Sequence, residues 1–325
     1  MSNSNTLTNS TLFLTGGAGF VGSYILEELL PYNPKKIYIV DNFFRGSKRN
    51  IEHLLSDTRI ELEVADLRTP GIIDKYMSQC DYCFHLSALR INACAANPRD
   101  GFEVMVQNTF DLVEAAVKYG IKKFIYSSSA SVYGLAHTFP TPESNHPYDN
   151  QTFYGAAKTF GEGLLRSFEH SNGLKWVGLR YFNIYGPRMD TDGKYTEVMI
   201  RWLDCIRSGK PPLIYGDGST TMDFIHVRDV AKANVAALIS SVTGEVFNVA
   251  TQTETSLRQL LDLLLKVNNS SLQPEYRPEN TVNPVSRRLA DISKARQQLG
   301  WNPSISLDKG LTELSQWYFN RIAAQ

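Results

Sequence analysis

The chain has 325 residues, of which 42% are hydrophobic and 20% are charged, a balance typical of a globular protein with a core of ordinary size. Its 33 basic and 33 acidic residues cancel, which argues against a nucleic-acid-binding protein that relies on bulk positive charge. The first ten residues are polar, and no apolar run approaches the roughly 18 residues of a membrane span, so we expect a cytoplasmic protein that binds neither nucleic acid nor membrane.

The first half of the chain alternates short apolar runs with amphipathic stretches. The pattern predicts strands at 11–15, 36–41, 60–65, 81–87, 123–128 and 176–181, and helices at about 21–30 and 154–170. Strands separated by helices pair in parallel, so we expect an α/β fold with a Rossmann-type doubly wound sheet. After residue 183 the elements are shorter, which indicates a smaller C-terminal α/β substrate lobe. We therefore predict a dinucleotide-binding domain at 1–183, to which part of 220–250 returns, and a mainly substrate-binding lobe at 184–325.

A glycine-rich turn follows the first expected strand. Gly17, Gly19 and Gly22 satisfy G-x-G-x-x-G between a strand and a helix. Side chains here would keep the backbone N–H groups and the helix N-terminus away from a pyrophosphate. Asp41 ends the second strand about 20 residues later, where an acid accepts hydrogen bonds from ribose hydroxyls and repels a 2′-phosphate. The sequence therefore predicts an NAD site, although the basic residues at 45–49 weaken the preference over NADP.

Tyr154 and Lys158 stand one helical turn apart and share a helix face. A nearby ammonium and an oxidised nicotinamide would lower the pKa of the phenol and make it a usable base. This pair alone is a weak signal, but a serine-rich segment follows the strand at 123–128, at the edge of the sheet where ligands bind. Ser129 is our candidate to hold both a substrate hydroxyl and the tyrosine, whereas Ser127, Ser128 and Ser131 are also compatible with a plain serine-rich loop.

Together these segments resemble the extended short-chain dehydrogenase/reductase family, in its nucleotide-sugar epimerase/dehydratase branch. The resemblance covers residues 12–301, nearly the whole chain. The matching segments are TGGAGFVGS at 15–23, VDN at 40–42, ADL at 65–67, FHLSA at 84–88, YSSSASVYG at 126–134, YGAAK at 154–158, LRYFNIYGPR at 179–188, DFIHVRDVA at 223–231 and LADISKARQQLGW at 289–301.

The resemblance implies roles for the matching residues. Tyr154 would be the acid/base, Lys158 would hold the nicotinamide ribose, and Ser129 would orient the sugar hydroxyl. Cofactor contacts are expected from Gly16, Gly19, Phe20, Val21, Gly22, Asp41, Asn42, Asp66, Leu67, Leu86, Ser87, Ala88, Ser127, Tyr154, Lys158 and Tyr181. Substrate contacts are expected from Ser129, Asn183, Arg188 and Arg288. The implied partners are NAD, a nucleotide-diphosphate sugar and a second copy of the chain, which would pair through helices at about 101–119 and 154–170.

One local comparison separates the branches of this family. The 4,6-dehydratases carry Thr-Asp-Glu where this chain has Ser129-Ala130-Ser131, and uronate decarboxylases carry Glu at the position of Ser131. Alanine and serine cannot do that proton transfer. The pattern is similar to UDP-glucose 4-epimerases, so we expect C4 epimerisation of a UDP-hexose or UDP-hexuronate through a transient 4-keto sugar. A 4-ketoreductase or dehydratase of the same family and a non-catalytic NAD-binding scaffold stay as alternatives.

The chain departs from the epimerase pattern at Met222, where such enzymes place an arginine that clamps the diphosphate. Arg188, Arg277, Arg287 and Arg288 are the candidates to replace it. Arg288 falls near the position that gates sugar size, where a guanidinium would meet a uronate carboxylate or a phosphate bidentately.

Other polar groups in apolar surroundings are expected to be structural. The C-x-x-C at 80–83 lies partly in an apolar strand and has no second pair at metal spacing, so we expect buried cysteines and no metal site. His85 and His226 lie in apolar strands and are expected to be satisfied core histidines. Asp223 and Asp229 are likewise expected to support the fold.

Overall fold

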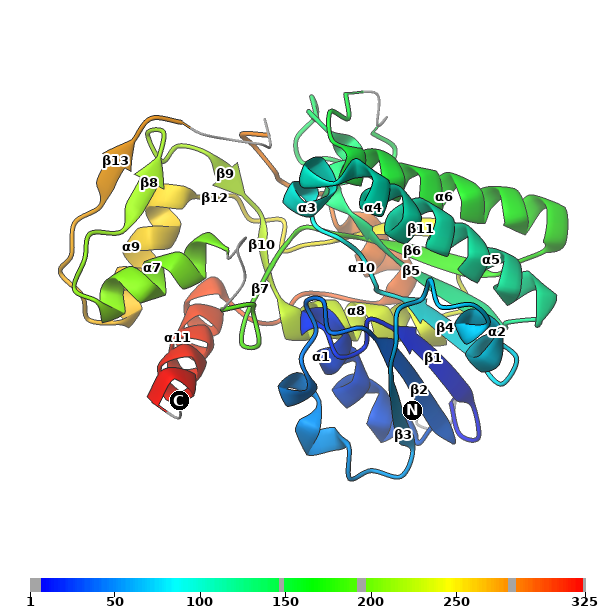
Figure 1. The fold of residues 1–325 in the computed structure, drawn as a ribbon. Helices are drawn as coiled ribbons and strands as arrows, with labels where there is room; N and C mark the ends of the chain where they lie inside the picture. The colour runs from blue at the N-terminus through cyan, green and yellow to red at the C-terminus, as the bar shows by residue number, and fades with distance from the viewer. Residues whose placement is uncertain (1–6, 146–148, 192–196, 280–284, 324–325) are drawn as a thin grey trace.

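A computed structural model describes residues 7–145, 149–191, 197–279 and 285–323. Its centre is a seven-stranded sheet in the order β11-β6-β5-β4-β1-β2-β3, in which every pairing is parallel (Figure 1). The strands are β1 (Thr11–Thr15), β2 (Lys36–Asp41), β3 (Ile60–Val64), β4 (Tyr82–His85), β5 (Lys123–Ser129), β6 (Trp176–Tyr181) and β11 (Glu245–Val249). The strand order runs outward in both directions from β1 and β4, as in a doubly wound Rossmann fold. The expected fold class is therefore confirmed.

Helices cover both faces of the sheet, and the strand interiors are correspondingly apolar. Leu12, Phe13 and Leu14 of β1 have no exposed surface. One face carries α1 (Phe20–Leu29), α8 (Val227–Ile239) and α10 (Ser293–Leu299), and the other carries α2 (Ile72–Met77), α5 (Asn108–Lys118) and α6 (Phe153–Asn172). None of the described helices is both long and apolar enough to cross a membrane.

The helix expected at 101–119 is a composite. It begins as α4 (Pro98–Phe102), continues through a π-helical segment, Glu103–Gln107, and ends as α5. A further short helix, α3 (Ile91–Ala96), precedes it. Because a π-helical segment adds one residue to a turn, the simple 3.6-residue period that predicted a single helix does not hold there.

The second lobe packs three amphipathic helices around its own core. Its elements are β7 (Asn183–Tyr185), α7 (Val198–Arg207), β8 (Leu213–Tyr215), β9 (Thr221–Met222), β10 (Phe224–His226), β12 (Thr255–Ser256), α9 (Leu257–Val267), β13 (Glu275–Arg277) and α11 (Leu307–Ala323). Trp202, Leu264 and Leu311 of α7, α9 and α11 are almost fully buried in this core. Figure 1 shows this lobe beside the large sheet.

The chain crosses between the two parts more than once. After β7, α7 and β8–β10 it returns as α8, which packs on α1, and as β11, which pairs with β6. It then leaves again for β12, α9 and β13. The boundary that we expected at residue 183 stays a prediction.

Asp223 and Asp229 hold the segments that connect the two parts. The Asp223 carboxylate accepts hydrogen bonds from the backbone N–H groups of Thr251, Gln252 and Ala290, at 2.8, 2.9 and 3.3 Å. Asp229 accepts hydrogen bonds from the backbone of residues 304–305 and from the Ser304 hydroxyl. Both acids are buried and act on loops, as expected of structural residues.

Candidate active site

The glycine turn between β1 and α1 leaves no room for side chains at Gly16 and Gly22. A Cβ at Gly22 would lie 2.6 Å from the Gly16 carbonyl oxygen, and a Cβ at Gly16 would lie 2.9 Å from the Ser87 backbone nitrogen. Gly16 also has a φ of 70°, which favours glycine. Gly19 caps α1 without a side-chain hydrogen bond, so the first N–H groups of the helix stay available for an anionic group.

A groove opens beside this turn at the carboxyl ends of β2, β3 and β4. It brings together predicted cofactor residues from four separate segments: Gly16, Asp41, Asn42, Asp66, Leu67, Ser87 and Ala88. The other predicted residues Gly19, Phe20, Val21 and Gly22 form the start of α1, and Leu86 follows β4, where its N–H donates to the Thr15 carbonyl at 3.2 Å. The groove is also lined by residues for which no cofactor contact was predicted: Val40, Phe44, Ala65, Arg68, Leu89, Asp100, Val104 and Asn108.

Asp41 lies at the mouth of the glycine turn. Its carboxylate accepts hydrogen bonds from the backbone N–H groups of Ala18, at 3.1 Å, and Phe43, at 2.9 Å. Burial raises the pKa of this carboxyl, and the two backbone hydrogen bonds oppose the shift. Two donors leave acceptor capacity on the two oxygens, so the group can still receive ribose hydroxyls. Arg45 pairs with Asp190 at 3.6 Å.

Asp66 is held in place by two neighbours. Arg68 donates to both carboxylate oxygens, at 3.0 and 2.9 Å, and Asn42 Nδ2 donates at 2.9 Å. The hydrogen bonds from Arg68 lower the pKa of Asp66 to about 2. Arg68 also reaches Asp100 and Glu103, at 2.7 and 3.1 Å, and so spans the groove from the end of β3 to the helix opposite.

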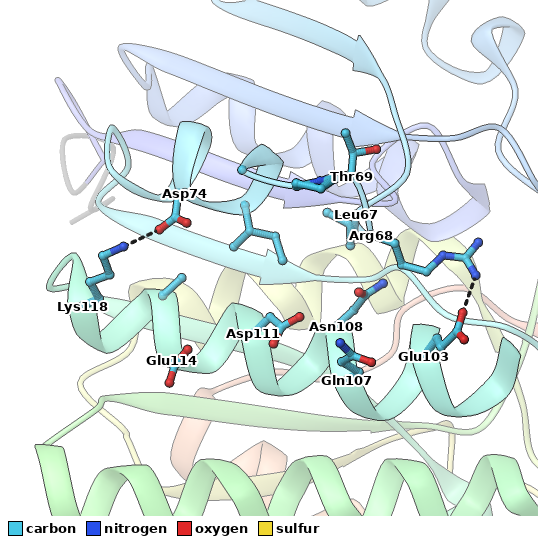
Figure 2. Close-up of a pocket in the computed structure, with 14 residues that line it drawn as sticks. Leu67, Arg68, Thr69, Asp74, Glu103, Gln107, Asn108, Asp111, Glu114 and Lys118 are labelled. Atoms are coloured by element: carbon cyan, nitrogen blue, oxygen red, sulfur yellow. Dashed lines mark hydrogen bonds and ion pairs between the residues drawn. The ribbon is translucent and has the colours of Figure 1, made fainter. Parts of the chain in front are cut away.

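The groove continues outward into a second, polar cavity, shown in Figure 2. Leu67, Arg68 and Asn108 line both cavities. The outer cavity is lined by carboxylates from α2 and from the composite helix: Asp74, Glu103, Asp111 and Glu114. The adenine end of the predicted cofactor site therefore opens toward an acidic surface.

Helix α6 carries the predicted tyrosine and lysine. Thr152 caps its N-terminus by accepting a hydrogen bond from the Gly155 N–H at 3.1 Å, which places Tyr154 in the first turn. Lys158 is 2% exposed, and its Nζ donates to the Ser127 carbonyl at 2.6 Å. The ammonium also lies 5.8 Å from the centre of the Tyr154 ring. Burial lowers the pKa of Lys158 to about 8.

Tyr154 is half-buried, and the pKa of its phenol is raised. Burial raises the pKa of the phenol, whereas a side-chain hydrogen bond with Ser129 and the charges of Arg90 and Arg45 lower it. We expected the Lys158 ammonium together with an oxidised nicotinamide to lower this pKa; for the chain by itself the pKa is raised. The reason is that burial dominates and that the Lys158 ammonium is directed at a carbonyl. Nothing in the sequence pattern predicted that Arg45 and Arg90 act on the phenol.

The serines after β5 have separate partners. Ser127 Oγ and Tyr181 Oη form a hydrogen bond at 3.1 Å, and Ser128 donates to Glu162 at 2.5 Å. Ser129 contacts Tyr154 and accepts a hydrogen bond from the Ser131 N–H at 3.1 Å. Of these serines, the structure brings Ser129 to the phenol, and it turns Ser128 into the interior.

A buried polar network that sequence reasoning missed lies behind this site. Arg180 of β6 donates to both oxygens of Glu162 on α6 and to Tyr133 Oη, the last at 2.9 Å. Tyr133 in turn donates to Asn248 of β11 at 2.6 Å. An arginine in the otherwise apolar strand 176–181 was the one sequence signal for such a network, because a buried guanidinium needs an acidic partner.

The predicted substrate residues are not all in one place. Arg188 pairs with Glu27 and donates to Ser23 of α1, in a cleft between α1 and α11. Arg288 is 7% exposed and its Nη1 donates to the Ala130 carbonyl at 2.6 Å, directly after Ser129. Asn183 begins β7, where its N–H donates to the Asp223 carbonyl at 3.1 Å.

The two core histidines behave differently. His85 lies between Thr15 and Thr109, at 3.0 and 2.9 Å, and both ring nitrogens are satisfied as expected. His226 Nδ1 accepts a hydrogen bond from the Arg228 N–H at 3.3 Å, but Nε2 has no hydrogen-bond partner within the described chain. The expectation of a fully satisfied ring is therefore wrong for His226, whose Nε2 lies 3.6 Å from Glu313.

Comparison with known proteins decides the family. The model of the NAD dependent epimerase/dehydratase family matches residues 12–250. The chain belongs to this family. It is 33% identical over 312 residues to a putative UDP-glucose 4-epimerase of Methanocaldococcus jannaschii. The match covers 95% of this chain and 98% of that protein.

Two further members of the family are similar over nearly the whole chain. A UDP-N-acetyl-alpha-D-glucosaminuronate decarboxylase of Bacillus cytotoxicus is 31% identical, with 94% of this chain and 96% of that protein covered. The structure of a UDP-N-acetylglucosamine 4-epimerase from Methanobrevibacter ruminantium M1, in complex with UDP-N-acetylmuramic acid, matches with a TM-score of 0.91 and 32% identity. That match covers 97% of this chain and 99% of the other.

The geometry described above fits the family's cofactor. The turn with its glycines at 16, 19 and 22, the start of α1 without a side-chain cap and the acceptor Asp41 suit the pyrophosphate and the ribose of NAD. The predictions of the family and of NAD as the cofactor are therefore confirmed. The contacts of individual residues with NAD stay predictions.

Proposed function

We propose that this protein is a UDP-sugar 4-epimerase with a tightly bound NAD. The observation that carries the proposal is the meeting of Ser129, Tyr154 and Lys158 at the carboxyl end of β5, next to a groove that fits NAD. The names of the M. jannaschii and M. ruminantium relatives support a 4-epimerase of UDP-sugars.

In this proposal each side chain has a defined task. Tyr154 takes the proton of the sugar C4 hydroxyl and later returns it, and Ser129 orients that hydroxyl toward the phenol. Lys158, already held by the Ser127 carbonyl, donates to the nicotinamide ribose and keeps positive charge near the site. Bound NAD supplies the hydride acceptor and donor. No net oxidation results, so the cofactor does not need to leave.

A decarboxylase is the main rival, because one relative has that name. Loss of a carboxylate as CO₂ requires a proton to be placed on the remaining carbon, and this chain has Ala130 and Ser131 where an acid would stand. These residues favour epimerisation, because that reaction loses no carboxylate and needs no such acid.

The test is to incubate the purified protein, without added cofactor, with each member of several C4-epimeric UDP-sugar pairs. We expect either member of one pair to give the same equilibrium mixture, with unchanged product mass. A product lighter by water or carbon dioxide, or turnover that consumes one NADH per product, would contradict the proposal.

We also propose that the protein is a homodimer. Three phenylalanines on neighbouring helices, Phe102 of α4, Phe110 of α5 and Phe160 of α6, are 41%, 37% and 39% exposed. These helices lie side by side on the outer face in Figure 1. Large exposed aromatic side chains on one face are typical of a surface that pairs with another chain.

A further inference from the structure

Arg288 differs from the other arginines that could replace the missing diphosphate clamp. Arg188 pairs with Glu27, Arg277 with Glu275 and Arg287 with Glu254, and the last two pairs are exposed. Arg288 is buried, and among the residues that the structure describes its guanidinium forms no ion pair and donates one hydrogen bond, to the Ala130 carbonyl at 2.6 Å. A guanidinium has five N–H donors, so most of its binding capacity is unused.

The guanidinium also lies where substrate chemistry is proposed to occur. The carbonyl that it contacts belongs to the residue after Ser129, and its side chain lines a small cleft with Ser131, Asn150 and Thr152. Thr152 caps the helix that carries Tyr154. Asp149 lines the same cleft, but its carboxylate is engaged by His137 Nε2 at 2.5 Å.

A buried cation without a counter-ion is costly, and an anionic ligand that enters the cleft would remove that cost. The anion has to reach the Ser129 side of the sugar. In a pyranose, C6 is attached to C5, the neighbour of the reacting C4, whereas the diphosphate is attached to C1 across the ring. A C6 carboxylate therefore matches the position of Arg288, and its two oxygens match the paired N–H donors of the guanidinium.

We infer that Arg288 binds a C6 carboxylate of the sugar, so that the substrate class is a UDP-hexuronate. This inference rests on the proposed function, because it places C4 of the sugar at Ser129 and Tyr154. The contact forms in at least one of the two sugar orientations that 4-epimerisation requires. Arg288 is thus a residue that sets specificity, and the reacting groups are those named above.

Calorimetric titration of the NAD-loaded protein with UDP-glucuronate, UDP-glucose and UDP tests the inference without turnover. We expect UDP-glucuronate to bind about tenfold or more tightly than UDP-glucose, the ratio for one charge-assisted hydrogen-bonded pair. Arg288→Met should abolish this preference and leave the affinity for UDP within about twofold, and Arg288→Lys, which keeps the charge, should retain part of it.

The neighbouring Arg287→Met is the matched control, because Arg287 is exposed and paired with Glu254; it should keep the preference. NAD content and the melting temperature of each variant show whether it is folded. Equal affinities for UDP-glucuronate and UDP-glucose in the unmodified protein would overturn the inference. An equal loss of UDP affinity in Arg288→Met would also overturn it, because Arg288 would then hold the diphosphate.

The two proposals fail in distinguishable ways. Rapid conversion of UDP-glucose with no preference for the uronate overturns the role of Arg288 and supports the epimerase. A uronate product lighter by carbon dioxide overturns the epimerase, and the affinity comparison still decides on Arg288.

Discussion

Glu162 and Arg180 form a bidentate ion pair in the interior, with Arg180 Nε 2.9 Å from Glu162 Oε1 and Arg180 Nη2 2.7 Å from Oε2. The two side chains are 6% and 7% exposed. Glu162 lies one helical turn beyond Lys158 on α6, and Arg180 lies on β6, so the pair fixes the helix that carries Tyr154 against the sheet.

Removing one partner of this pair should destabilise the protein strongly. In Arg180→Met the Glu162 carboxylate stays buried without its cation, and we expect the free energy of unfolding to fall by about 3–5 kcal/mol. Urea denaturation measures the loss. Arg258→Met, which removes an exposed pair with Asp262 on α9, should cost less than about 1 kcal/mol. Equal effects of the two substitutions would contradict this role.

Tyr154→Phe should separate chemistry from binding. Without the phenolic hydroxyl there is no group to move the C4 proton, so we expect kcat to fall by about 10²–10⁴-fold. NAD content and the melting temperature should not change. Tyr119→Phe removes another hydroxyl, which donates to Asp74 on the surface, and should leave kcat unchanged. Retained activity in Tyr154→Phe would remove the residue from its proposed role.

Gly22→Ala should prevent NAD from binding, and the rest of the protein should stay folded. The new Cβ would lie 2.6–2.8 Å from backbone atoms of Gly16 and Gly17, so the turn must shift. Release and quantification of the bound cofactor from purified protein measures the loss. Gly163→Ala is the control, since a Cβ there meets nothing within 4 Å; it should keep NAD and gain about 0.5–1 kcal/mol of stability. Full NAD content in Gly22→Ala would contradict the assignment of the turn.

Lys158 should make the stability of the NAD-free protein depend on pH. Burial lowers its pKa to about 8 in the fold, whereas an unfolded lysine titrates near 10.4. Between these values the unfolded chain binds more protons, so stability rises with pH, by at most about 1.4 kcal/mol per pH unit. Compared with Lys158→Met, the wild-type protein should therefore gain stability as pH rises from about 8 to about 10. Lys122→Met, at an exposed lysine paired with Asp81, should give no such difference.

The dimer proposal predicts that charged residues on the surface around Phe102, Phe110 and Phe160 produce monomers. The double variant Phe110→Asp, Phe160→Asp should sediment as a monomer, because two carboxylates would have to be buried in the interface. Tyr215→Asp, at a residue of β8 that is 44% exposed on the other lobe, should leave the association state unchanged. A wild-type protein that sediments as a monomer would refute the proposal directly.

Features that depend on neighbours in sequence could be predicted, and those that depend on distant pairing could not. The strands around Leu12 and Val177 and the turn at Gly16–Gly22 follow from local apolar pattern and glycine spacing, and the structure has them within a few residues. The Glu162–Arg180 pair joins a helix to a strand, and no local pattern shows which acid an arginine meets.

The arginines of the site show the same difference between what local sequence predicts and what depends on distant partners. The sequence offered four of them as replacements for the diphosphate clamp, with Arg188 and Arg288 as predicted substrate contacts, and burial together with the lack of an acidic partner within the described chain distinguishes Arg288. The effect of Arg45 and Arg90 on Tyr154 likewise depends on two loops that meet the start of α6 in space. The raised pKa of Tyr154 in the chain by itself has the same origin, because the sequence could not show how deeply the phenol is buried.

The return of the chain to the large sheet limits how this protein can be divided. A fragment that stopped at residue 183 would leave the outer side of β6 unpaired, since β11 covers it, and would take α8 away from the apolar side of α1. Such an open edge is a template for strand pairing between molecules and hence for aggregation. A cofactor-binding half can therefore be produced on its own only if residues 224–249 are grafted onto it.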